Sequence, residues 1–183
     1  EATVKGAVLA KKEVGEDHDI VLIGDQNAIE PILHKEGAKA SEFEIVHCTE
    51  RIGMGEHPAK AYMKKPDSSI GIGFRLLKEN KLDAFASAGN SGAMLAGCML
   101  TIKPVYGVIR PSITTVLPKL DGSVGILLDV GTNIDCKPDV LYQFAILGSE
   151  YARHVHNIKN PAVGLMNIGE EEEKGNLITQ AAH

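Results

Sequence analysis

The sequence predicts an α/β fold with a mostly parallel sheet covered by helices. Short apolar, β-branched runs alternate along the chain with longer segments of helical period. Two of the expected strands, residues 84–88 and 124–130, are apolar throughout, as are strands buried on both faces. The chain has 183 residues, 44% hydrophobic and 23% charged, so it is long enough to bury one sizeable core.

The elements are expected from the first residues onward, because Val4 and Val8 share one face of a helix. Strands are expected at residues 19–23, 44–48, 84–88, 113–117, 124–130 and 162–168. Helices are expected at 2–13, 27–35, 56–64, 68–79, 91–102 and 138–156, and a last one begins near Glu172. The helix at 138–156 has a core-facing stripe at three- and four-residue steps: Val140, Phe144, Leu147, Tyr151 and Val155.

Domain organisation follows from the absence of internal repeats and low-complexity linkers, which predicts one α/β domain over residues 1–183. The first residues already have the pattern of a helix interior, and residues 176–183 end without a stop signal. We therefore expect the chain to be a fragment of a longer protein.

Composition excludes several classes of function. The net charge of −5 creates no field that attracts a polyanion, so nucleic acid is not an expected partner. The three cysteines are far apart, without a CxxC pair, which indicates a reducing, cytosolic compartment. No run approaches the roughly 20 apolar residues of a membrane-spanning helix. The seven histidines form no HxxxH or HExxH pair, so no metal site is predicted.

The first loop that is suited to binding or catalysis is residues 87–93, between an expected strand and an expected helix. Ligands of open α/β sheets bind beyond the carboxyl ends of strands. Glycines allow close backbone approach, Asn90 or Ser91 can cap the helix, and the exposed amides suit a phosphate or a carboxylate. The alternative is a glycine-rich turn with an ordinary helix cap.

The second loop, residues 127–138, gathers carboxylates, an amide, a thiol and an ammonium group before the long helix. Lys137 either neutralises a phosphate or is a solvated surface lysine. Asp129 is either part of a site or a structural acceptor for backbone amides, and Asp135 either joins it or belongs to the turn. Cys136 lacks a partner histidine at a telling position, so a nucleophilic thiolate is the less favoured interpretation.

Two charged segments are further candidates for a functional site. Residues 167–176 place four glutamates between Gly169 and Lys174, which is either a solvated helix start or a paired acid and base. Residues 57–67 carry a basic patch, which either docks an acidic partner or is a solvated face. The lysines of this patch are Lys60, Lys64 and Lys65.

Together these segments resemble the PlsX family of phosphate acyltransferases over essentially the whole chain. The family's SAGN[TS]GA signature matches residues 87–93, and LLDVGxNxDxKP matches residues 127–138. QFAxxGSxYAR matches residues 143–153, and GLxNIGxExxKG matches residues 164–175. Departures are mild: Ser91 replaces the commoner threonine, and Ile109 stands where an acidic residue usually precedes Arg-Pro. The family's opening DxMGGD strand and its C-terminal portion have no counterpart in the chain.

The resemblance implies a three-layer α/β/α, Rossmann-like fold similar to phosphotransacetylases and to isocitrate and isopropylmalate dehydrogenases. It implies an enzyme that moves a fatty acyl group from acyl carrier protein to inorganic phosphate, giving acyl phosphate for phospholipid synthesis. Family members act as homodimers in the cytoplasm and associate peripherally with the membrane. No cofactor and no metal are implied.

The resemblance also assigns roles to residues of the three loops. Phosphate or acyl-phosphate binding falls to Gly89, Asn90, Ser91 and Asp135. Catalytic roles fall to Asn133, Lys137, Glu171 and Lys174. Apart from the resemblance, the basic patch itself offers Lys60, Lys64 and Lys65 as the residues on which the carrier protein would dock as the acidic partner.

Three other functions remain as alternatives. A phosphotransacetylase-like enzyme would use acyl coenzyme A in place of the carrier protein. A nicotinamide-dependent dehydrogenase would need clustered arginines, whereas the four arginines here are scattered along the chain. A noncatalytic module that binds carrier protein or lipid would explain the basic patch and leave the three polar loops without a purpose.

Overall fold

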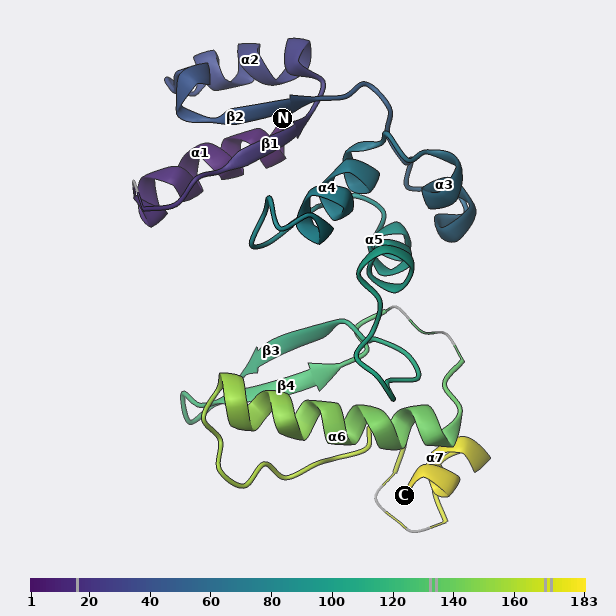
Figure 1. Ribbon diagram of the computed structural model, residues 1–183. Coiled ribbons are helices and arrows are strands. Elements are labelled where there is room, and N and C mark those ends of the chain that lie inside the picture. The colour runs from purple at the N-terminus through teal and green to yellow at the C-terminus, as the bar shows by residue number, and fades with distance from the viewer. Residues whose placement is uncertain (16, 132, 134, 170, 172) are drawn as a thin grey trace. The chain divides into compact units, whose positions relative to one another are not determined.

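The computed structural model describes the whole chain except residues 16, 132, 134, 170 and 172 (Figure 1). The chain folds as two compact units, Glu1–Lys103 and Pro104–His183, and each is described by itself. Helices combine with short strands, including a parallel pair, so the predicted α/β class is confirmed. The expectation of a single domain over residues 1–183 stays a prediction.

The first unit begins with two strands and two long helices. These elements are α1 (Ala2–Val14), β1 (Val21–Gly24), α2 (Gln26–Lys35) and β2 (Glu44–His47), with a 3₁₀ turn at Ala40–Glu42 before β2. The strands pair in parallel, with Val21 opposite Glu44. Two features set the boundaries of the helices: Gly15 ends α1 with φ of 74°, and the Asp25 carboxylate caps α2 by accepting from Asn27 N at 3.1 Å. The strands and helices expected here are confirmed to within about two residues.

An apolar cluster holds these four elements together. Its buried members are Val4, Val8, Leu22, Ile29, Leu33 and Phe43. Leu33 is fully buried, and burial of a leucine of this kind contributes about 2 kcal/mol. The pairing of Val4 with Val8 on the inner face of α1 is the one that the sequence predicts.

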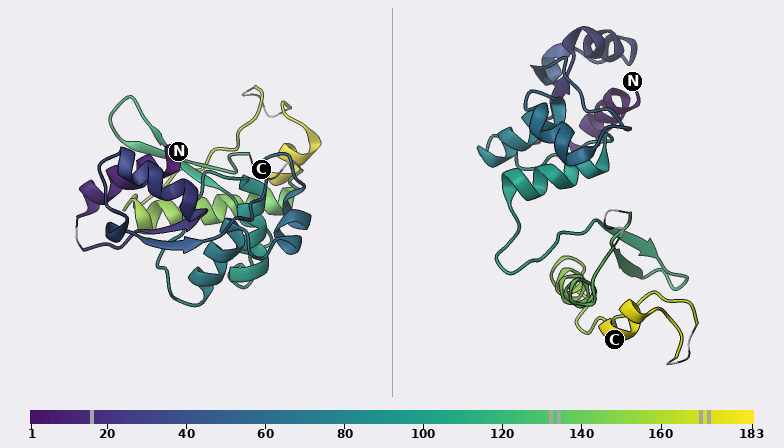
Figure 2. Two further views of the ribbon diagram at one scale, coloured as in Figure 1. Left: turned by 90° about the horizontal axis from the view of Figure 1, so that it is seen from above. Right: turned by 90° about the vertical axis from the view of Figure 1, so that its right-hand side faces the viewer.

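The remaining described elements of the first unit are helices joined by loops (Figure 2). It contains α3 (Pro58–Lys64), α4 (Ser69–Lys78) and α5 (Ser91–Gly97), and a π turn at Cys98–Ile102 prolongs α5. Phe74 is 2% exposed and stands edge-on to Tyr62 and to Phe85, with ring centroids 6.1 and 5.3 Å apart. The close approach of α5 requires Gly97, where an added Cβ would lie 2.1 Å from the Phe74 ring.

The strand expected at residues 84–88 is not formed, which corrects the prediction. Phe85 is half-buried and packs against Phe74, while Ala84, Ala86 and Ala88 are exposed. Small alanines bury little area and have low strand propensity, so one aromatic side chain anchors this segment without strand pairing.

The second unit has a two-stranded sheet and two helices: β3 (Thr114–Pro118), β4 (Val124–Leu128), α6 (Pro138–Val155) and α7 (Leu177–Ala182). The strands are antiparallel, with Val116 opposite Ile126, so the expectation of parallel strands is wrong for this pair. The strand β4 is half-buried along its length rather than fully buried. The helix α6 packs on β4 through Gly148, where a Cβ would lie 2.8 Å from Leu128 Cδ1.

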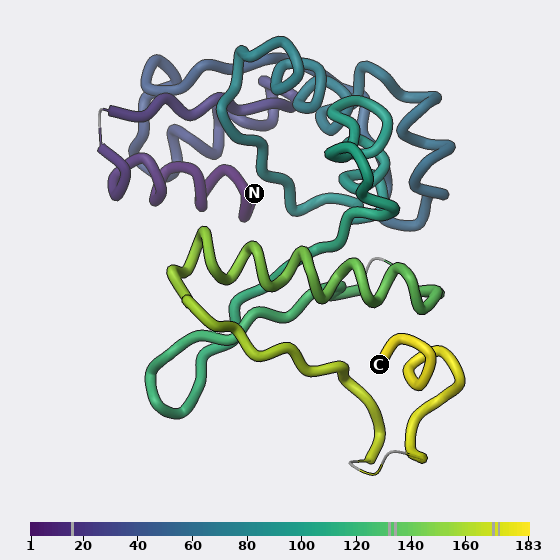
Figure 3. Tube along the Cα trace, turned by 60° about the horizontal axis from the view of Figure 1, so that its bottom comes forward, coloured from purple at the N-terminus to yellow at the C-terminus, as the bar shows by residue number. Residues whose placement is uncertain are grey.

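The core-facing stripe predicted for α6 is confirmed in its first half. Val140 and Phe144 are buried, at 3% and 6% exposed, whereas Val155 is 54% exposed. Residues 162–168, which follow α6, form an extended path without a strand, another correction (Figure 3). Met166 and Ile168 are largely exposed there because they have no strand partner among the described residues. The last helix begins at Leu177, later than expected.

Among the residues that the structure describes, no helix is long and apolar enough to cross a membrane.

Candidate functional site

Asn90 caps α5 and is buried at the start of that helix. Its Oδ1 accepts a hydrogen bond from Ala93 N at 3.0 Å, and the residue is 5% exposed. An asparagine in the extended conformation before a helix satisfies one of the amides that the first turn leaves unpaired. The prediction of a helix cap in this loop is therefore confirmed for Asn90.

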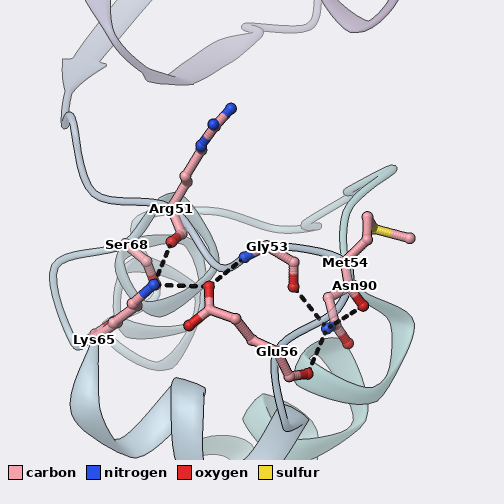
Figure 4. A network of polar contacts seen from close by, with 7 residues as sticks. All are labelled: Arg51, Gly53, Met54, Glu56, Lys65, Ser68 and Asn90. Atoms are coloured by element: carbon pink, nitrogen blue, oxygen red, sulfur yellow. Dashed lines mark hydrogen bonds and ion pairs between the residues drawn. The ribbon is translucent and has the colours of Figure 1, made fainter.

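The amide nitrogen of Asn90 faces a second loop, residues 53–56 (Figure 4). It donates toward the carbonyl oxygens of Gly53 at 3.1 Å, Glu56 at 3.3 Å and Met54 at 3.4 Å. The side chain thus joins the loop that follows β2 to the first turn of α5. Both ends of the Asn90 amide are directed at protein groups, which gives this residue a positioning part.

Glu56 and Lys65 hold the same loop from its other side (Figure 4). Glu56 Oε1 accepts from Gly53 N at 2.6 Å and from Lys65 Nζ at 2.7 Å. Lys65 Nζ also donates to Arg51 O at 3.0 Å. The Lys65 ammonium, and then the Gly53 amide, lower the pKa of Glu56, so its carboxylate is charged at neutral pH.

Gly89, Ser91 and Gly92 complete the first predicted loop. Gly89 N donates to Ser87 Oγ at 3.1 Å. Ser91 is exposed at the first position of α5, and its hydroxyl is not used as a cap. A Cβ at Gly92 would lie 2.5 Å from Pro58 Cγ, so the first turns of α5 and α3 are in close contact. The loop is a tightly held turn with one exposed hydroxyl.

In the second unit, Asp129 organises the predicted loop at residues 129–137. Asp129 has φ of 63°, an unusual conformation for a residue other than glycine. Its Oδ1 accepts from Asn133 N at 3.2 Å and from Asn133 Nδ2 at 3.1 Å. Asn133 Nδ2 also donates to Pro111 O at 3.4 Å. These contacts support the alternative that Asp129 is a structural acceptor. They also fix the position of Asn133, whose backbone and side-chain amides both donate to Asp129.

The thiol of Cys136 lies against the same carboxylate, with Sγ 3.8 Å from Asp129 Oδ2. Burial raises the pKa of this thiol, and the charge of Asp129 raises it further. The thiol is therefore protonated at neutral pH, which agrees with the less favoured standing of a nucleophilic Cys136.

Asp135 and Lys137 are both exposed beside this loop. Arg110 Nη1 donates to the backbone oxygen of Asp135 at 3.0 Å, so the Asp135 carboxylate is not taken up by that bond. Lys137 precedes Pro138 at the N-terminus of α6, and among the described residues its ammonium has no ion-pair partner. Of the predicted site residues in this loop, these two present charge to solvent.

The third predicted loop brings Glu171 and Lys174 together. Lys174 N donates to Glu171 O at 2.9 Å, closing a turn. Gly169 has φ of 96°, and a Cβ there would lie 2.5 Å from Lys174 Cγ and 3.1 Å from Glu171 Oε2. This close approach gives the physical reason for glycine at position 169. Of the other three glutamates of the run, residues 170 and 172 lie outside the described residues.

The basic patch of α3 divides into two kinds of lysine. Lys60 and Lys64 are exposed, and within the described part of the chain neither has an ion-pair partner. Lys65 is instead paired with Glu56. Sequence reasoning missed Glu56 as a member of this network. A usable signal was present, because residues 49–57 follow the carboxyl end of β2, where ligands of α/β sheets bind.

The second unit also contains a groove of about 880 Å³ between β4, α6 and residues 158–166. Ile126, Leu128 and Phe144 contribute apolar walls. Such a lining suits hydrocarbon better than a phosphate, and Asp129 of the second loop is among the lining residues. Among the described residues, no group of three or more histidine, cysteine, aspartate or glutamate side chains is arranged to hold a metal ion.

Comparison with known proteins adds independent information. A family model described as "Fatty acid synthesis protein" matches residues 1–183. The chain is 45% identical over 181 residues to a phosphate acyltransferase of Dictyoglomus turgidum, covering 99% of this chain and 53% of the relative. It is 46% identical over 165 residues to the Thermoanaerobacterium thermosaccharolyticum phosphate acyltransferase, covering 90% of this chain and 48% of the relative. The chain spans about half the length of the curated relatives it matches.

Proposed function

The chain belongs to the fatty acid synthesis protein family, and from this premise we propose that it is part of an enzyme that transfers a fatty acyl group from acyl carrier protein to inorganic phosphate. The observation that carries the proposal is the 45% identity to a phosphate acyltransferase over 99% of this chain. The resemblance stated from four sequence signatures supports the carrier protein as acyl donor. A second copy of the chain and a membrane surface are proposed as further partners on the same basis.

The proposed reaction needs no covalent intermediate on the enzyme. A phosphate oxygen attacks the thioester carbonyl, the carbon–sulfur bond breaks, and the carrier thiolate leaves and takes up a proton. The products are acyl phosphate and free carrier protein. Holding a phosphate oxygen over the face of the thioester carbonyl carbon, in position for attack, supplies much of the rate enhancement in such a transfer. Burial, and then the charge of Asp129, raise the pKa of Cys136, which disfavours a thiolate nucleophile at that position.

The described residues suggest how the work is divided. Ser91 is proposed to donate its hydroxyl to phosphate, and Gly89 to allow close approach of the backbone, in a loop that Asn90 holds in place. The exposed Lys137 ammonium and the Glu171–Lys174 turn are proposed to bind the reacting groups, where positive charge stabilises the developing oxyanion. Asp135 is proposed to take part in binding phosphate or acyl phosphate, and Asn133 to orient its own loop through Asp129.

The test measures release of the carrier thiol by the full-length protein from a long-chain acyl carrier protein, with and without inorganic phosphate. Lys137→Ala is the main variant because its side chain is exposed and unpaired among the described residues, so folding is preserved. Lys159→Ala, also exposed in the second unit, is the matched control. We expect release that requires phosphate, falls at least tenfold in Lys137→Ala by the oxyanion argument, and is unchanged in the control.

Other outcomes distinguish the alternatives. Consumption of acyl coenzyme A without reaction of the carrier protein identifies the phosphotransacetylase-like enzyme. Binding of carrier protein without any release identifies the noncatalytic module. Thiol release that does not depend on phosphate contradicts the proposed acceptor.

A further inference from the structure

The geometry points to the Glu56–Lys65 ion pair as a positioning device for the loop that begins α5, where the proposed function places phosphate. The inference rests on that proposed function and deepens it. It removes Lys65 from the surface assigned to carrier-protein docking and gives it a role in the affinity for phosphate. Neither Glu56 nor Lys65 is proposed to touch the reacting atoms.

The three lysines of the basic patch differ in what their side chains contact. Lys60 and Lys64 extend into solvent from α3. Lys65 follows the helix, and its side chain, 29% exposed, turns toward the loop after β2 (Figure 4). Its ammonium binds Glu56 Oε1 at 2.7 Å and Arg51 O at 3.0 Å. A lysine that is bound at two points is a poor docking charge, because a partner must first displace these contacts.

Gly53 is hydrogen-bonded at both of its backbone polar groups. Its N–H donates to Glu56 Oε1 at 2.6 Å, and its C=O accepts from Asn90 Nδ2 at 3.1 Å. Gly53 is thus the point where the ion pair and the helix cap meet. A shift of the Glu56 side chain breaks its hydrogen bond to Gly53, one of the three residues whose carbonyl oxygens accept from Asn90 Nδ2.

Asn90 connects the loop at residues 53–56 to the first turn of α5. Asn90 Oδ1 holds Ala93 N at 3.0 Å, so a continuous series of contacts links Lys65, Glu56, Gly53, Asn90 and the first turn of α5. Ser91, the exposed residue of that turn, lies between two of these anchored positions. Loss of the charge on Lys65 frees Glu56, loosens Gly53 and lets the first turn of α5 move. The expected consequence is weaker binding of phosphate.

The experiment uses the full-length protein and the variants Lys65→Met and Glu56→Gln. We expect the KM for inorganic phosphate to rise about two- to fivefold, the range that follows from loss of one partly exposed ion pair. The KM for acyl carrier protein is expected to stay within twofold of wild type. Lys65→Arg keeps the charge and the donors, so it is expected to restore most of the phosphate affinity.

The chain offers a matched control. Lys81 Nζ lies 2.8 Å from Glu79 Oε2, and Lys81 lowers the pKa of Glu79 as Lys65 lowers that of Glu56. This pair follows α4 and, among the described residues, makes no hydrogen bond or ion pair with the loop at residues 53–56. Lys81→Met is therefore expected to leave the KM for phosphate unchanged. Hydrogen exchange at the Gly53 and Ala93 amides, measured without substrates, is expected to speed up in Lys65→Met and not in Lys81→Met.

Each contrary outcome has a distinct meaning. If Lys60→Met, Lys64→Met and Lys65→Met all raise the KM for acyl carrier protein and leave that for phosphate unchanged, docking is correct and the inference is overturned. Unchanged exchange at Gly53 and Ala93 in Lys65→Met also overturns it, whatever the kinetics. Wild-type release that needs no phosphate contradicts the proposed function itself.

Discussion

Replacing Asn90 by aspartate separates the two roles of this side chain. Aspartate caps helices as well as asparagine does, so the bond from Ala93 N is kept. Aspartate has no amide donor, so the contacts to the carbonyls of Gly53, Met54 and Glu56 are lost. Two amide protons can serve two of these carbonyls at once, at about 1 kcal/mol each. We therefore expect Asn90→Asp to lower the free energy of unfolding by about 2 kcal/mol.

Urea unfolding of the full-length protein, followed by circular dichroism, measures this loss. With a slope of about 2 kcal/mol per molar urea, the midpoint is expected to fall by about 1 M. Asn176→Asp is the matched control. Asn176 caps α7 by accepting from Thr179 N at 2.9 Å, and among the described residues its amide nitrogen has no acceptor. The control is expected to leave the midpoint unchanged. A shift below about 0.3 M for Asn90→Asp would show that Asn90 is only a helix cap.

Three further predictions concern packing and the protonation of a thiol. Gly97→Ala is expected to lower the free energy of unfolding by about 1–3 kcal/mol, because the new Cβ meets the Phe74 ring, and thermal unfolding measures this. Gly6→Ala, exposed within α1 with no atom within 4 Å of the new Cβ, is expected to raise it by about 0.5–1 kcal/mol in the same assay, and a loss would contradict the open space seen there. Burial is the largest cause of the raised pKa of Cys136, and the charge of Asp129 is the next. Asp129→Asn removes that charge, so the pKa of Cys136 is expected to fall and the thiol to react faster with iodoacetamide at pH 8. An unchanged rate would assign the raised pKa to burial alone.

Helices and the first two strands were predictable because their signals are local. Val4 with Val8, and Val140 with Phe144, repeat at helical spacing and are buried as that spacing requires. The two absent strands were expected from short apolar runs, which do not by themselves supply a partner strand. Phe85 is the one large side chain of the first run, and it packs against a helix. Met166 and Ile168 of the second run remain exposed.

The antiparallel pairing of β3 with β4 was indicated by the sequence between them. The alternation of strands and helices along the rest of the chain favoured parallel pairing instead. Residues 119–123, between the two strands, contain Asp121 and Gly122, a dipeptide typical of hairpin turns. Gly122 has φ of 80°, and Asp121 Oδ1 accepts from Ser123 N at 2.9 Å. A turn of five residues joins antiparallel strands readily and is too short for the crossover that parallel strands need.

The candidate site was predictable as loops and less so as individual roles. Asn90 was foreseen as a cap, but its contacts with residues 53–56 depend on a segment more than 30 positions away. Glu56 was missed although its partners Gly53 and Lys65 are only three and nine positions away, because its link to the α5 cap passes through Gly53 to Asn90. Local spacing identifies which residues can cap a helix, whereas long-range contacts require the fold.

The contact between Gly92 and Pro58 has a consequence for how this protein can diverge. A Cβ at position 92 would stand 2.5 Å from Pro58 Cγ and 2.8 Å from Pro58 Cβ, so the ring and a methyl group cannot both be present without displacing a helix. A mutational path to alanine at 92 therefore passes first through a smaller residue at 58. The two positions should vary as a pair among descendants, and proline at 58 keeps position 92 closed to every other amino acid.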